Sequence, residues 1–352
     1  MNYQDALTIV REHGKPDYFV TITASPAWPE IVENLAPGEH AVNRPDLVAR
    51  VFALKLKALL KSLTEDGVLG VVVAYCWTVE FQKRGLPHAH ILLIMRSDHK
   101  PRTPADVDRV VSAELPDDSD PQQAQLFETV SSLLMHGPCG AFGATKPCMN
   151  DQGVCSKGFP KAFSEETSLP IDEYPVYRRR DNGRCVEKNG MVLDNRWVVP
   201  YNPYLVKKFK AHINVHVCTS IRAVKYLYKY IHKGHDRAAV EVVVHDEVKD
   251  FLDARYVGPP ESCWRLLSFD MHGKSHVVER LPVHLPGGQA CVFDSDDPAA
   301  AVAADQTTRL QGYFNLVKEG WRAGGLRSAA AGPLYYVDLP KWYIWNQKGT
   351  KC

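Results

Sequence analysis

Hydrophobic and polar positions near the N-terminus follow the periods of a helix, a strand and a second helix. Residues 1–15 carry a helical pattern, and residues 17–24 alternate as a strand that ends in a proline-rich segment. The next helix is predicted to begin near Pro45. The apolar side chains expected on one broad face of this helix are Val48, Val51, Phe52, Leu54, Leu59 and Leu60.

The next two apolar runs predict a β-hairpin with a polar tip. Residues 70–81 and 88–95 are strand-like, and the turn Lys83-Arg-Gly-Leu-Pro87 lies between them. Residues 213–217 return to strand alternation and residues 221–232 predict a helix, so we expect an α+β fold with a central antiparallel sheet and flanking helices. We also expect a helix over residues 247–256 and strands over 264–269 and 275–285.

Composition changes after residue 100. Proline and aspartate cluster at residues 116–121, cysteines and glycines follow, and a basic turn comes at Arg178–Arg180. We therefore predict that residues 101–200 form a Cys-rich insertion with a small fold of its own.

Two histidines follow the tip of the predicted hairpin. Side chains of a strand alternate between its two faces, so His88 and His90 are expected to point the same way. If the hairpin closes over residues 83–87, Gln82 lies opposite His88 and Glu80 lies opposite His90. Two imidazoles with oxygen donors suit a divalent cation that keeps positions open for a substrate. The alternative is that both histidines lie on a solvated strand face.

A second group of candidate ligands lies inside the insertion. His136, Cys139, Cys148 and Cys155 fall within a short stretch rich in glycine and proline. Three thiols and one imidazole can hold a structural Zn²⁺ ion in a tetrahedral site. The spacing is irregular, and the alternative is a set of plain buried thiols.

The predicted helix over residues 221–232 carries phenols and lysines. Tyr226 and Tyr230 are one helical turn apart and share a face, whereas Tyr228 points elsewhere. A phenol can attack a phosphodiester if a metal polarises the phosphate and cations stabilise the developing charge. The alternative is an amphipathic helix with half-buried tyrosines. The basic stripe expected to contact phosphates beside these phenols consists of Lys225, Lys229 and Lys233.

Composition narrows the class of protein. The net charge of +1 gives no support for a nucleic-acid partner, so a case for DNA must depend on local charge. No apolar run approaches the roughly 20 residues that span a membrane, and the start of the chain has no signal-peptide pattern. We expect an intracellular protein with no membrane partner, nuclear in a eukaryote. In that setting the nine cysteines favour metal ligands or buried thiols over disulfides.

Several motifs together resemble the replication-initiator (Rep) domain of Helitron transposases, which are two-tyrosine HUH endonucleases. The resemblance covers most of the chain. It is carried by Phe19–Ile31, Glu80–Leu93, Tyr177–Gly183, Val199–Leu205, Lys225–Asp236, Phe251–Val257 and Ser262–Arg265.

The resemblance implies an HUH-type fold and a site-specific endonuclease that acts on single-stranded DNA. His88 and His90 would bind Mg²⁺ or Mn²⁺, with Glu80 or Gln82 as the third ligand. Tyr226 and Tyr230 would be the nucleophiles, forming a 5′-phosphotyrosine intermediate. Further candidates for gripping the DNA strand are Lys207, Lys208, Lys210, Arg178–Arg180, Trp28 and Trp197.

The resemblance also implies an order of parts along the chain. Residues 1–100 would be the first part of the nuclease domain, 101–200 the insertion, 201–285 the second part with the tyrosine helix, and 286–352 an extension toward a helicase. No phosphate-binding motif of a helicase occurs in these residues, so the helicase is expected as a missing partner domain.

Three alternatives remain open. The chain could be a catalytically inactive or domesticated DNA-binding remnant of such a transposase. Histidine-triad nucleotide hydrolases also alternate histidines on a strand, but they need a third histidine where this chain has Leu92. A purely structural zinc protein would leave the hairpin and the tyrosine helix unexplained.

Overall fold

The computed structural model divides the chain into two compact units, Met1–His276 and Val277–Cys352. It describes residues 3–81, 85–139, 146–170, 175–219, 257–286, 288, 308–322 and 335–344.

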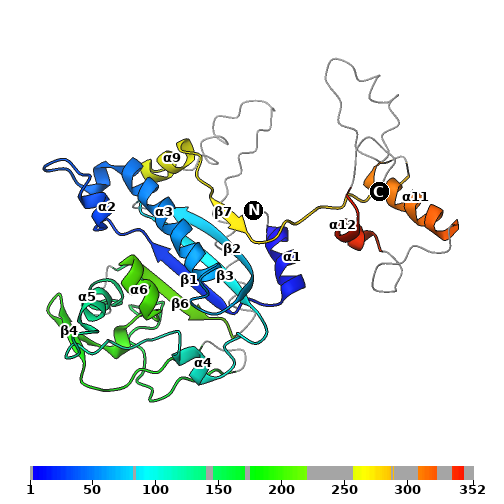
Figure 1. Ribbon diagram of the computed structural model, residues 1–352. Helices are drawn as coiled ribbons and strands as arrows, with labels where there is room; N and C mark the ends of the chain where they lie inside the picture. The colour runs from blue at the N-terminus through cyan, green and yellow to red at the C-terminus, as the bar shows by residue number, and fades with distance from the viewer. Residues whose placement is uncertain are drawn as a thin grey trace. The chain divides into compact units, whose positions relative to one another are not determined.

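A five-stranded antiparallel sheet forms the centre of the first unit, with the strand order β6-β1-β3-β2-β7 (Figure 1). The α+β class and the antiparallel sheet predicted from the sequence are confirmed. The strands span β1 Tyr18–Thr23, β2 Val72–Phe81, β3 Pro87–Met95, β6 His212–Val217 and β7 His272–Lys274.

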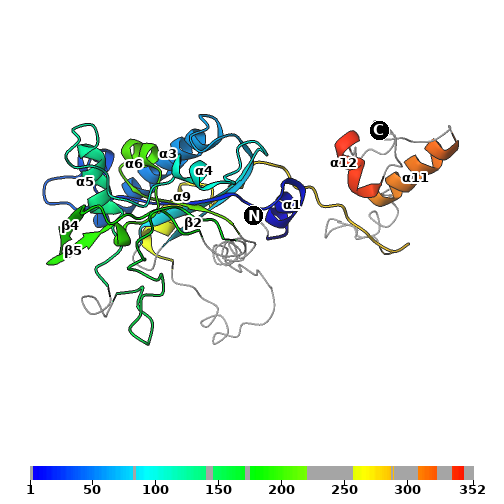
Figure 2. The same cartoon turned by 90° about the horizontal axis from the view of Figure 1, so that it is seen from below.

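The two faces of the sheet differ in chemistry. One face carries apolar side chains such as Val20 and Ile91, and these pack into the main core with α3 (Pro45–Thr64) and α6 (Pro203–Phe209). The other face is covered in part by α1 (Tyr3–His13), whose Ala6 packs against apolar residues of β2 and β3. Figure 2 shows the same layers from below. The polar side chains of β2 and β3 lie on this second face.

Helix α3 has the amphipathic pattern predicted for it, with one exception. Val48, Phe52 and Leu59 are buried as expected, whereas Leu54 is 70% exposed and Leu60 is half-buried. Leu56 and Leu63 complete the buried face instead, and they follow Phe52 and Leu59 at the helical spacing of four residues. The assignment of Leu54 to the core face was therefore wrong.

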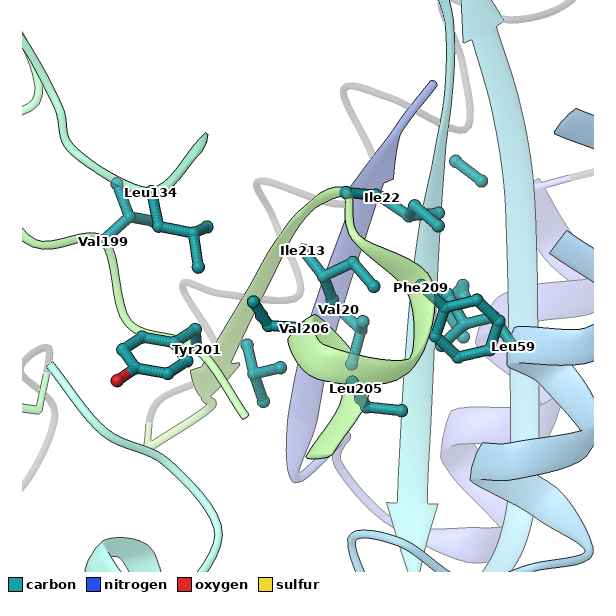
Figure 3. Close-up of a cluster of buried hydrophobic side chains, with 14 of the residues drawn as sticks. Val20, Ile22, Leu59, Leu134, Val199, Tyr201, Leu205, Val206, Phe209 and Ile213 are labelled. Atoms are coloured by element: carbon teal, nitrogen blue, oxygen red, sulfur yellow. The ribbon is translucent and has the colours of Figure 1, made fainter. Parts of the chain in front are cut away.

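Residues of the predicted insertion share the main core with the sheet. Leu134 and Val199 pack in the same cluster as Val20 and Ile213 of the sheet (Figure 3). The division of the chain into four parts stays a prediction. The elements between β3 and α6 are α4 Pro104–Asp108, α5 Ala124–Leu133, β4 Cys185–Lys188, β5 Met191–Asp194 and the 3₁₀ turn η2 Asn195–Trp197.

Two strands predicted beyond residue 263 were wrong. Residues 264–269 were expected as a strand, but residues 264–266 are the last turn of helix α9 (Pro259–Leu266), which begins with two prolines after Gly258, and residues 267–269 form no strand. Trp264 of α9 is buried against Phe52 of α3, at 5.8 Å between ring centroids. The described part of the expected strand 275–285 holds no strand; β7 ends one residue earlier.

Helices and a segment without regular structure make up the described part of the second unit. No helix in the described part of the chain is both long and apolar enough to cross a membrane. The remaining elements are α2 Pro29–Val32 and η1 Ala41–Asn43 in the first unit, and α11 Arg309–Arg322, η3 Tyr336–Asp338 and α12 Leu339–Trp342 in the second.

Candidate functional site

The β2–β3 hairpin places both histidines beside a carboxylate. Glu80 pairs directly with His88 across the two strands, and Thr78 pairs with His90. Because alternate residues of a strand share a face, all four side chains project from the same side of the sheet. This is the side opposite the main core.

The register of the hairpin differs from the predicted one by two residues. We had expected Gln82 opposite His88 and Glu80 opposite His90, with Pro87 in the turn. Pro87 is instead the first residue of β3, a position where proline is tolerated, and its carbonyl accepts a hydrogen bond from the N–H of Ala24 at 2.9 Å. A shift of two residues keeps each side chain on its face, so Glu80 still meets both histidines.

One carboxylate oxygen lies close to both imidazoles. Oε2 of Glu80 is 3.1 Å from Nε2 of His88 and 3.4 Å from Nε2 of His90. The two rings are perpendicular, with centroids 4.8 Å apart. The three side chains offer ligand atoms that all lie within 4.8 Å of one another, a group that could hold a metal ion.

Burial and hydrogen bonding set the charges of this group. Burial by itself would raise the pKa of Glu80, but hydrogen bonds from His88 and His90 outweigh it and lower that pKa to about 2. Burial lowers the pKa of His90, which favours the neutral imidazole. An ionised carboxylate beside a neutral imidazole is a donor set suited to a cation.

Thr21 of β1 is a contact of the site that the sequence analysis missed. Its hydroxyl Oγ1 lies 3.1 Å from Nδ1 of His90, and the two residues pair directly between β1 and β3. A neutral imidazole carries one N–H, so a metal on Nε2 would replace the contact of that nitrogen with Glu80. Nδ1–H would then donate to the Thr21 hydroxyl, and Nε2 would keep the lone pair that a metal needs. The alternation of residues 17–24 puts Thr21 on the polar face, but only the long-range register brings it to His90.

Polar side chains run in two rows across the sheet. Asn214, Thr21, His90 and Thr78 are successive partners on β6, β1, β3 and β2. The neighbouring row consists of His212, Thr23, His88 and Glu80. The metal-ligand group therefore lies within a wider polar strip of the sheet.

His212 lies in the same row as His88, but its imidazole is hydrogen-bonded to the backbone at the end of α5. Its Nδ1 donates to the carbonyl of Leu133 at 2.7 Å, and burial lowers the pKa of its imidazole. This contact assigns His212 to packing between β6 and the end of α5.

The four candidate zinc ligands also come together. Ligand atoms of His136, Cys139, Cys148 and Cys155 all lie within 4.8 Å of one another. Sγ of Cys155 is 3.3 Å from Nε2 of His136. The second predicted group thus has the donors and the proximity of a metal site.

The thiols of this group differ in acidity. Burial raises the pKa of Cys139 to about 12 and also raises that of Cys148. Burial acts in the same direction on Cys155, but backbone N–H groups of Phe159 and Lys157 direct hydrogen bonds to its sulfur and lower its pKa overall. Cys155 is therefore the thiol whose surroundings best accommodate negative charge.

Several candidate DNA contacts have structural roles instead. Arg179 is buried, and its Nη1 donates to the carbonyls of Ala113, Asn195 and Val198. The guanidinium of Arg180 pairs with the carboxylate of Glu114. Both tryptophans proposed for base stacking, Trp28 and Trp197, are buried as well.

The exposed lysines remain candidates for DNA contacts. Lys207 and Lys210 are exposed at the end of α6, whereas Lys208 donates to Oγ of Ser62 at 2.8 Å. The other predicted site residues, namely Gln82, Lys225, Tyr226, Lys229, Tyr230 and Lys233, lie outside the described residues.

The N-terminal part of the chain is similar to a known family. Residues 1–93 match the model described as the Helitron helicase-like domain at the N-terminus, and this match spans 93 of the chain's 352 residues. No curated protein matches the chain. The segment that contains Glu80, His88 and His90 is thus similar to the N-terminal domain of Helitron proteins.

Proposed function

We propose that the chain is a metal-dependent endonuclease that nicks and rejoins single-stranded DNA in a rolling-circle, Helitron-type transposon. The observation that carries the proposal is the convergence of His88 and His90 on Glu80 inside a segment that matches the Helitron N-terminal domain. An HUH-type fold, and action in the nucleus of a eukaryotic host, are parts of the same proposal.

The donor set fits a catalytic divalent cation. His88 and His90 would bind it through ring nitrogens and Glu80 through a carboxylate oxygen, with Gln82 as the alternative oxygen donor. Two imidazoles with one oxygen leave coordination positions for water and phosphate. The choice of Mg²⁺ or Mn²⁺ comes from the resemblance to Helitron Rep domains. When bound, the ion polarises the oxygens of the scissile phosphate.

Tyr226 and Tyr230 are the proposed nucleophiles. The phenol of one gives up its proton as its oxygen forms a bond to the scissile phosphorus, and the bond from phosphorus to the 3′ oxygen breaks. The leaving oxygen takes up a proton and becomes a 3′-OH, while the 5′ end stays linked to the tyrosine. The second tyrosine serves strand transfer, and rejoining reverses the first step. Lys225, Lys229 and Lys233 are the proposed phosphate contacts.

The test uses the purified chain, Mn²⁺ and a pool of single-stranded DNA labelled at either end, read on a denaturing gel. A 5′-phosphotyrosine link predicts that the 3′ label migrates with the protein and that the 5′ label appears on a shorter free fragment. His88→Ala should abolish both products, because one imidazole ligand is lost. His40→Ala, at an exposed histidine outside the group, is the matched control and should leave them unchanged.

The tyrosine assignment is tested in the same assay. The double variant Tyr226→Phe and Tyr230→Phe should form no adduct, whereas Tyr228→Phe should react as the unchanged chain does. A fully active double variant would overturn the assignment. Mn²⁺ binding without any adduct over a broad DNA pool would favour a DNA-binding remnant that has lost catalysis.

A further inference from the structure

We propose that His136, Cys139, Cys148 and Cys155 hold a structural zinc ion that fastens residues 146–161 to the rest of the first unit. The inference is independent of the nuclease proposal, because it concerns a different group of ligands. It rests on the donor set, on the distances among the donors and on the backbone that brings them together.

The distances agree with tetrahedral coordination. Around a zinc ion with Zn–S near ~2.3 Å and Zn–N near ~2.0 Å, neighbouring sulfur and nitrogen ligands lie about 3.6 Å apart. Sγ of Cys155 and Nε2 of His136 are 3.3 Å apart, and the whole set lies within 4.8 Å. Because four protein ligands fill a tetrahedral shell, this site has no open position for a substrate.

A tight turn brings Cys148 and Cys155 together. The N–H of Ser156 donates to the carbonyl of Cys148 at 2.7 Å, and the N–H of Asn150 donates to the carbonyl of Val154 at 3.0 Å. The side chain of Asn150 also accepts hydrogen bonds from backbone N–H groups within the turn. The sequence therefore builds a hairpin-like loop with one thiol at each end.

His136 links this loop to the core. Its backbone N–H donates to the carbonyl of Trp197 at 2.8 Å, and Trp197 is buried in the main core. Its imidazole stacks on Phe159, at 4.2 Å between ring centroids. An ion bound to His136 and to the thiols of the loop would therefore cross-link the loop to a rigid part of the unit.

The chemistry of the donors selects zinc over the ions expected at the other site. Thiolates are soft ligands that prefer zinc, whereas Mg²⁺ and Mn²⁺ prefer oxygen. A disulfide would use only two of the three sulfurs, and all three are free thiols. We therefore expect two sites with different ions, one closed and one open.

The test measures metal content in the full chain, expressed with zinc and dialysed against buffer without metal. Mass spectrometry of the elements should find about one zinc ion per chain. Cys155→Ser should lose the zinc, whereas Cys185→Ser, at an exposed cysteine outside the group, should keep it. The double variant His88→Ala and His90→Ala should keep it as well, which separates this site from the proposed catalytic one.

A second measurement covers the case in which Cys155→Ser does not fold. The unchanged chain is titrated with a mercurial reagent in the presence of a chromophoric zinc indicator. Release of about one zinc ion per chain as the thiols react supports the site. Absence of zinc from the unchanged chain, even after refolding with zinc, would overturn the proposal, as would full zinc retention by a folded Cys155→Ser variant.

Discussion

Individual side-chain contacts orient the candidate metal ligands Glu80, His88 and His90. Glu80 faces both imidazoles through one oxygen, so the three side chains already converge before any cation is considered. The hydroxyl of Thr21 lies 3.1 Å from Nδ1 of His90, the ring nitrogen on the side away from Glu80, and such a hydrogen bond fixes which ring nitrogen can bind a metal. The neighbouring Thr23 lies on the same face one row away, beside His88.

Replacing Thr21 by valine should weaken metal binding while keeping the shape of the side chain. Loss of the hydroxyl at Nδ1 of His90 predicts an affinity for Mn²⁺ about 10–100-fold lower, measured by titration calorimetry. Thr21→Ser should restore most of the affinity, and Thr23→Val is the matched control. Equal Mn²⁺ affinity in Thr21→Val and the unchanged chain would contradict a role for this contact.

At the scale of elements, local patterns predicted most strands but not how they pair. Alternation located β1, β2 and β6, and a continuous apolar run located β3, which is buried on both faces. It could not fix the hairpin register, since Pro87 resembles a turn residue, whereas in the structure it pairs with Phe81 of β2 and its carbonyl accepts a hydrogen bond from Ala24. The strand predicted over residues 264–269 failed because a short apolar run fits either a strand or the buried face of a helix. The contact of Thr21 with His90 joins residues 69 apart, beyond any local pattern.

The basic turn at Arg178–Arg180 is explained by contacts between elements. Glu114 accepts hydrogen bonds from the backbone N–H of Arg180 at 2.7 Å and from its guanidinium. Burial would raise the pKa of Glu114, but its hydrogen bonds with Arg180 lower it below the ordinary 4.5. The turn is thereby fastened to the segment that follows α4.

Glu114→Gln should destabilise the first unit at neutral pH. Since Arg180 is partly exposed, we expect a loss of about 1–2 kcal/mol in the free energy of unfolding, measured with urea. A lowered pKa stabilises the folded state above 4.5, and this contribution disappears as the pH falls through the folded-state value. The difference in the free energy of unfolding between Glu114→Gln and the unchanged chain should therefore become smaller in acid. Glu166→Gln, at an exposed carboxylate, is the control. A difference in unfolding free energy that does not depend on pH would contradict the stabilising role of the ionised Glu114 carboxylate.

At the scale of the whole molecule, the sheet is assembled from distant parts of the chain. The central strands β1, β2 and β3 come from the first 95 residues, whereas the edge strands β6 and β7 begin at residues 212 and 272. The segment that matches the Helitron domain therefore lacks both edges of the sheet. The first compact unit, which ends at His276, includes all five strands.

A chain shortened to residues 1–276 should fold and bind metal as the full chain does. Because it contains the whole sheet and both groups of ligands, its thermal unfolding midpoint and its affinity for Mn²⁺ should match those of the full chain. Calorimetry of the two proteins side by side provides the measurement. Loss of cooperative unfolding in the shortened chain would show that the second unit supports the first.

Strand β3 has a consequence for how mutants of this protein must be interpreted. All nine of its residues are buried, and it is paired along both edges. Variants at His88 or His90 therefore need a measurement of folding beside the measurement of activity, because these side chains lie inside a buried strand. Variants at Thr21 of β1 and Glu80 of β2 test the same contacts with less risk to folding, because these two side chains are only partly buried.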